Sequence, residues 1–149
     1  MKLNANSENV HEQELQEIAA MIRRIYLSVL KDAIGRAETN GACFYACVLL
    51  HQAIEKFSSM AATIRGGDGL SDGGYFDPWG RGFGHYWVEA RLDSGSAWVI
   101  DITADQFGGP DVLVAPLAGS QITYRPGDQS KVDEHISEHG TFTGTDFQS

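Results

Sequence analysis

The stretch from His85 to Thr103, HYWVEARLDSGSAWVIDIT, contains two strand-like runs separated by a short loop. The runs are His85 to Leu92 and Ala97 to Thr103, and the loop is Asp93-Ser94-Gly95. A three-residue loop with glycine at its end is typical of a hairpin in which a type I turn is followed by a residue in the left-handed conformation. The sequence therefore predicts an antiparallel hairpin here.

The length of this loop sets the register of the hairpin. Leu92 then faces Ser96, and counting back pairs Trp87 with Asp101 and His85 with Thr103. Because successive side chains of a strand point to opposite faces, a two-residue turn would shift the pairing by one residue and mix the two sets of side chains that this register separates. One face carries His85, Trp87, Glu89, Val99, Asp101 and Thr103, and the other carries Tyr86, Val88, Ala90, Leu92, Trp98, Ile100 and Ile102. His85 and Asp101 become diagonal neighbours within side-chain reach.

Two helices are predicted before the hairpin. Residues 8–34 carry an amphipathic stripe with apolar residues three and four positions apart. A second helix fits residues 41–57, with Asn40 as its N-cap. The first stripe is Leu15, Ile18, Ile22, Ile25 and Val29, and the second is Cys43, Cys47, Leu50, Ile54 and Phe57.

The other segments are less regular. Residues 66–84 contain eight glycines and are expected to form a long loop. Short strands fit residues 61–65, 112–114 and 122–124, and residues 126–149 are expected to form a loosely ordered polar tail. A chain of 149 residues suits a single domain.

Composition argues against several classes of partner and location. The net charge of −9 at pH 7 argues against a nucleic-acid partner, because phosphate binding requires clustered Lys and Arg. No apolar run approaches the length that spans a membrane, and residues 1–8 lack the apolar core of a signal peptide. Two cysteines are too few for a disulfide scaffold. We therefore expect a protein of the cytoplasm, or one delivered from it without a Sec signal.

The two cysteines, Cys43 and Cys47, are four residues apart on the second predicted helix. A disulfide is disfavoured, because Cβ atoms at this helical spacing lie about 5–6 Å apart and a disulfide requires about 3.8 Å. Cys43 lies in the first turn, where the positive end of the helix dipole favours a thiolate. The alternative interpretation is two small buried residues.

A thiolate nucleophile requires an imidazole, and the imidazole requires a carboxylate that fixes its tautomer. The hairpin provides that pair as His85 and Asp101, with Asp105 as a less favoured carboxylate. Three motifs match in order: Gly41-Ala42-Cys43 opening a helix, His85-Tyr86-Trp87-Val88-Glu89, and Trp98-Val99-Ile100-Asp101-Ile102-Thr103. Over residues 39–107 the chain resembles the transglutaminase-like superfamily of papain-like cysteine enzymes.

The resemblance implies an α+β fold, with the Cys43 helix packed on an antiparallel sheet, and a Cys43-His85-Asp101 triad without a cofactor or metal. Such a triad attacks an amide of a protein or peptide through a thioester, as a protease, amidase, glutamine deamidase or transglutaminase. The Cys43 backbone N–H is one oxyanion donor. The candidates for the second donor are Asn40, otherwise a helix cap, and Gln106, otherwise a turn residue. Trp87 either shields the His–Asp pair or is an ordinary aromatic residue of the sheet. Tyr75 and Trp79 either line a substrate groove or fasten the glycine-rich loop to the core.

Two other functions fit parts of the sequence. His135-Ile136-Ser137-Glu138-His139 matches the H-x-x-E-H pattern of some zinc enzymes, although it lies in the polar tail. The same fold could also serve as a non-catalytic module that binds a partner protein, which the acidic surface would suit.

Overall fold

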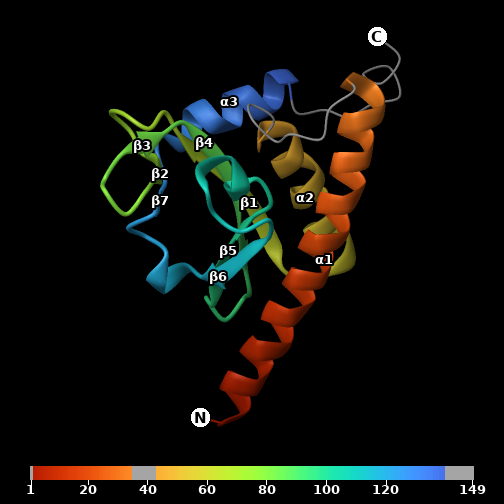
Figure 1. Ribbon diagram of the computed structural model, residues 1–149. Helices are drawn as coiled ribbons and strands as arrows, with labels where there is room; N and C mark the ends of the chain where they lie inside the picture. Colours follow the sequence, from red (N-terminus) through yellow and green to blue (C-terminus); the bar gives the residue numbers. More distant parts are fainter. Residues whose placement is uncertain (1, 35–42, 140–149) are drawn as a thin grey trace.

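The hairpin forms the middle of a four-stranded antiparallel sheet in the computed structural model, which describes residues 2–34 and 43–139 (Figure 1). Its strands are β1 (Ala61–Gly67), β4 (His85–Arg91), β5 (Ala97–Asp101) and β6 (Leu113–Pro116). The order across the sheet is β1-β4-β5-β6. Of the short strands predicted from sequence, residues 61–65 fall within β1, and residues 112–114 overlap β6.

The predicted register of the hairpin is confirmed. Arg91 pairs with Ala97 and Val88 with Ile100. The Leu92 N–H donates to the Ser96 carbonyl oxygen at 2.9 Å, which closes the three-residue loop. Gly95 has a φ of 100°, the left-handed conformation that glycine adopts without a Cβ penalty.

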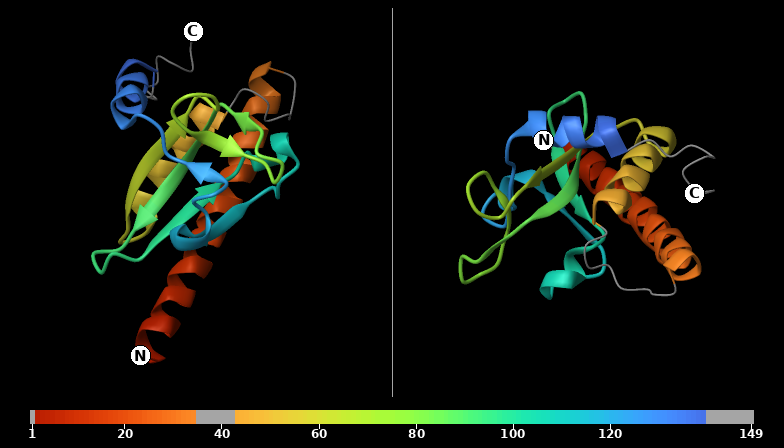
Figure 2. Two further views of the ribbon diagram at one scale, coloured as in Figure 1. Left: turned by 90° about the vertical axis from the view of Figure 1, so that its left-hand side faces the viewer. Right: turned by 90° about the horizontal axis from the view of Figure 1, so that it is seen from above.

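The predicted apolar face of the hairpin is covered by two helices, α1 (Lys2–Ile34) and α2 (Cys43–Phe57) (Figures 1 and 2). α2 packs on β1 and β4, whereas α1 packs on α2 and on the β5–β6 side of the sheet. The main hydrophobic core lies between these layers and includes Val88 and Ile100 from the sheet and Leu15 and Leu50 from the helices.

The ends of both predicted stripes were wrong. On α1, Ile25 and Val29 are 47% and 40% exposed, and Tyr26 is buried instead. On α2, Phe57 is 56% exposed. A strict alternation of three and four residues averages 3.5, so the predicted stripe drifts away from the buried face of a straight helix of 3.6 residues per turn.

The opposite face of the hairpin is covered by a smaller antiparallel sheet with the order β3-β2-β7. Its strands are β2 (Gly74–Phe76), β3 (Gly82–Phe83) and β7 (Tyr124–Arg125), the last of which overlaps the predicted strand 122–124. The predicted loop of residues 66–84 therefore contains the end of β1 and a second hairpin. Glycine permits this packing, because a Cβ on Gly82 would clash with the carbonyl oxygen of Gly69.

The segment after β5 contains the 3₁₀ helices η1 (Ala104–Phe107) and η2 (Leu117–Gly119), and the last described element is the helix α3 (Gln129–His139). The prediction of a loosely ordered tail was wrong for α3, which packs on β1 and buries Val132 in the main core. A single buried valine and a partly buried Ile136 give a helical pattern too short to be visible in a polar sequence.

These elements define an α+β protein with an antiparallel sheet and helices on one of its faces (Figure 2). None of the helices described combines the length and apolarity needed to cross a bilayer.

Candidate functional site

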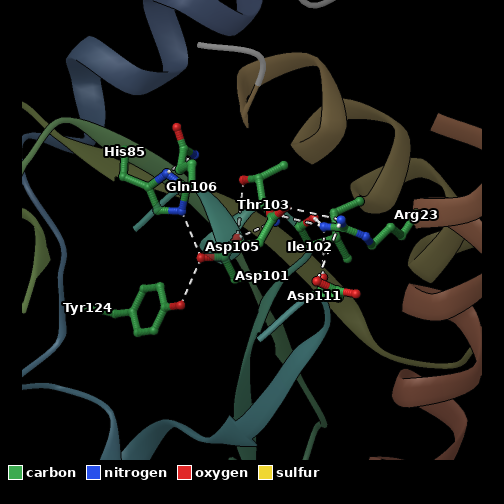
Figure 3. A network of polar contacts seen from close by, with 9 residues as sticks. All are labelled: Arg23, His85, Asp101, Ile102, Thr103, Asp105, Gln106, Asp111 and Tyr124. Atoms are coloured by element: carbon green, nitrogen blue, oxygen red, sulfur yellow. Dashed lines mark hydrogen bonds and ion pairs between the residues drawn. The ribbon is translucent and has the colours of Figure 1, made fainter. Parts of the chain in front are cut away.

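The predicted His85–Asp101 pair forms where the two hairpin strands meet the small sheet. His85 is the first residue of β4 and Asp101 is the last residue of β5. The His85 Nε2 atom lies 2.7 Å from Asp101 Oδ2 (Figure 3). Both side chains are buried, with residue exposures of 1% and 2%. The diagonal contact expected from the register is therefore confirmed.

The Asp101 carboxylate is held by three further donors. Oδ1 accepts hydrogen bonds from the Thr103 backbone N–H at 2.9 Å and from its hydroxyl at 3.3 Å. Oδ2 accepts the Tyr124 hydroxyl at 2.7 Å (Figure 3). Hydrogen bonds of this kind offset the cost of burying a polar side chain away from water. Sequence analysis missed Tyr124, since no local pattern links β7 to β5.

The environment of His85 favours its charged form. Burial lowers the pKa of the imidazole, but the Asp101 charge and hydrogen bond, with smaller contributions from Cys43, outweigh burial and raise the pKa to about 9. These contributions include a hydrogen bond between the His85 and Cys43 side chains. Since Nε2 is engaged by Asp101, Nδ1 is the ring nitrogen that can face Cys43, and the same nitrogen lies 3.4 Å from Gln106 Nε2.

The two cysteines differ in burial. Cys43 is the first residue of α2 and is half-buried, whereas Cys47 is buried, and both are free thiols. Burial raises the pKa of the Cys47 thiol well above its ordinary value, with smaller contributions from Cys43 and Asp101. Cys47 is therefore a neutral core residue.

Of the two candidate oxyanion donors, the structure brings Gln106 to the site. Gln106 lies on η1, and its Nε2 atom is 3.4 Å from His85 Nδ1 (Figure 3). Asn40 lies outside the described residues. Asp105, the less favoured carboxylate, instead accepts hydrogen bonds from two nitrogens of the Arg23 guanidinium at 3.1 and 3.2 Å, and it points away from His85 (Figure 3).

An aromatic layer surrounds the buried pair. Trp87 is fully buried, with its ring centroid 6.3 Å from that of His85. Phe107, which the sequence did not single out as a site residue, packs edge-on against the His85 ring with 4.9 Å between the ring centroids. Tyr75 stacks on Phe107 and meets His85 edge-on at 6.0 Å, so it is a buried wall of the site.

Trp79 does not join this layer. It lies in the β2–β3 turn, is 78% exposed, and carries the Arg81 guanidinium over its ring. Asp77 holds that turn by accepting the backbone N–H groups of Trp79 and Arg81, each at 2.9 Å. Within the described residues, Trp79 is therefore separate from the His85–Asp101 site.

The H-x-x-E-H segment lies in α3, and its first histidine makes protein contacts. His135 Nδ1 lies 2.7 Å from the Tyr86 hydroxyl oxygen, and the His135 ring stacks on that of Phe44 with 4.1 Å between the ring centroids. Among residues 2–34 and 43–139, no three His, Cys, Asp or Glu side chains gather in a way that would hold a metal ion.

Comparison of the chain with protein-family models, with curated proteins and with solved structures finds no significant match.

Proposed function

We propose that the protein is a thiol-dependent enzyme that cleaves or transfers an acyl group through a Cys43-His85-Asp101 triad. The observation that carries this proposal is the buried imidazole held between Asp101 and Cys43, with its pKa raised to about 9. At neutral pH such an imidazole is an imidazolium ion, which stabilises a neighbouring thiolate.

The proposed reaction follows from these positions. The Cys43 thiolate attacks an amide carbonyl carbon, and the carbonyl oxygen becomes an oxyanion. The Cys43 backbone N–H at the start of α2 and the Gln106 side chain are the proposed donors to that oxyanion. His85 Nδ1–H gives its proton to the departing amine as the C–N bond breaks, leaving a thioester. Neutral His85 then takes a proton from the water or amine that attacks the thioester, and Cys43 leaves as a thiolate.

The proposed substrate is an amide of a protein or peptide, and the proposed fold relationship is to papain-like and transglutaminase-like enzymes. The packing of the Cys43 helix against an antiparallel sheet that carries His85 and Asp101 on adjacent strands supports this relationship. A cytoplasmic location is part of the same proposal, because a reactive thiol without a disulfide partner suits a reducing compartment.

The test is the pH dependence of iodoacetamide labelling, mapped to each cysteine by mass spectrometry. We expect Cys43 to be alkylated rapidly at mildly acidic pH, and Cys47 to react only on unfolding because it is 4% exposed. In His85→Ala the reactivity of Cys43 should approach that of a free thiol, which has a pKa of about 8.5. The matched control is His51→Ala, because His51 lies on α2 in a groove against β1 and α3.

Acyl transfer is tested with p-nitrophenyl acetate. Wild-type protein and Cys47→Ser should release a burst of p-nitrophenolate and carry an acetyl group on Cys43, and Cys43→Ser should show no burst. Unreactive cysteines, or cysteines that react alike and ignore His85, would overturn the proposal.

A further inference from the structure

We infer that Tyr124 is a positioning residue of the site, which acts on His85 by sharing the Asp101 oxygen that His85 binds. The inference rests on the proposed function, since it concerns the same triad. Tyr124 contacts neither Cys43 nor a reacting atom in that scheme, so its effect must pass through the carboxylate.

The geometry that carries this inference is a single oxygen with two donors. Asp101 Oδ2 receives His85 Nε2 and the Tyr124 hydroxyl, both at 2.7 Å. The other oxygen, Oδ1, accepts hydrogen bonds from the backbone N–H and the hydroxyl of Thr103. The carboxylate therefore cannot rotate to offer Oδ2 elsewhere without breaking hydrogen bonds at both of its oxygens.

Tyr124 is built into the site as a fixed donor. Tyr124 is 2% exposed. Its ring packs nearly edge-on against the rings of Trp87 and Tyr75, with centroid-to-centroid distances of 5.3 and 5.4 Å. Burial and the charge of Asp101 both raise the pKa of this phenol far above its ordinary range. The hydroxyl therefore stays protonated, and donates, throughout the pH range in which His85 titrates.

A permanent donor on Oδ2 has a definite consequence for His85. The Tyr124 hydroxyl withdraws part of the negative charge of the oxygen that stabilises the imidazolium. It thus limits how strongly Asp101 holds the proton on His85, while it fixes the direction in which Nδ1 points. A general acid must release its proton during the reaction, so a limit of this kind favours turnover.

The experiment measures the rate of Cys43 alkylation by iodoacetamide as a function of pH in Tyr124→Phe. The alkaline limb of this rate–pH profile is the part above neutral pH in which the rate changes as His85 loses its proton. In the wild type this limb is expected near pH 9. Among the described residues, loss of the hydroxyl leaves His85 as the only donor to Oδ2, so the pH midpoint of this limb should move upward by about half a unit or more. With Asp101→Asn already present, Tyr124→Phe should leave the limb unmoved, because the charge through which Tyr124 acts is gone.

Tyr86→Phe is the matched control. Its hydroxyl is also part-buried and hydrogen-bonded, but to His135 on the helix-covered face of the sheet. It should keep the wild-type limb. If the limb is present in the wild type but does not move in Tyr124→Phe, or moves equally in the Asp101→Asn background, Tyr124 is only a packing residue. If the wild type shows no limb that depends on His85, the proposed function itself fails.

Discussion

His85 shows at the scale of one residue how a buried histidine can remain charged. Burial alone lowers the pKa of an imidazole, and His85 is only 1% exposed. The adjacent Asp101 carboxylate reverses that effect by charge and by a 2.7 Å hydrogen bond. The carboxylate is itself fixed in place by hydrogen bonds from Thr103 and Tyr124.

This shift predicts how the stability of the fold depends on pH. The folded-state pKa of His85 is raised from 6.5 to about 9, so its contribution to stability is fully present below 6.5 and is lost as the pH rises through 9. That contribution is on the order of 3 kcal/mol. We therefore expect His85→Gln to lower the free energy of unfolding by urea more at about pH 6 than at about pH 10. A stability difference that is constant across this range would contradict the assignment of the shift to His85.

At the scale of elements, a single arginine of α1 fixes the segment that follows β5. Arg23 donates to the carbonyl oxygens of Ile102 and Asp111 at 2.7 and 3.1 Å, and it binds the Asp105 carboxylate (Figure 3). These contacts hold η1, which carries Gln106 beside His85. The first helix thereby supports the site, although it contributes no residue to the triad.

Arg23→Gln tests this role. The Arg23 side chain is 12% exposed, so removing its guanidinium leaves carbonyl and carboxylate oxygens without their donor. We expect a loss of about 2 kcal/mol in the free energy of unfolding and slower alkylation of Cys43. The neighbouring Arg24 is exposed on the same helix and provides the matched control, Arg24→Gln. Equal behaviour of the two variants in urea titrations would show that the Arg23 contacts do not hold η1.

At the scale of the whole molecule, the sequence predicts what depends on local periodicity. The hairpin register follows from a period of two and from Gly95, and this register alone is enough to place His85 beside Asp101. The start of the α1 stripe, Leu15 and Ile18, was also predicted. Such features need only the residues nearby in the chain.

Features that depend on distant packing were not predictable in this way. The second sheet pairs β2 with β7 across about fifty residues, and its glycines allow backbones to approach where the sequence indicates only a loop. Tyr124 reaches Asp101 only because that pairing exists. A hydroxyl that acts from another sheet leaves no spacing or periodicity in the sequence to reveal it.

The two sheets also differ in how firmly they are held. β2, β3 and β7 have three, two and two residues, and the buried cluster that joins them to the hairpin is Tyr75, Trp87, Val99 and Tyr124. The main sheet has longer strands and packs on the large core beneath α1 and α2. Short strands with little buried apolar area open locally at a lower free energy than the core.

Native-state hydrogen exchange measures this difference. We expect the amides of Tyr75 and Phe76, which lie in β2, to exchange through an opening that costs less than global unfolding and depends weakly on urea. The amides of Val88 and Ile100 in the main sheet should exchange only through global unfolding. Since the small sheet carries Tyr124, that opening removes one donor from Asp101 and exposes His85 to solvent. Equal exchange free energies in β2 and β4 would instead make the two sheets one cooperative unit, in which the His85–Asp101 pair is opened only when the whole chain unfolds.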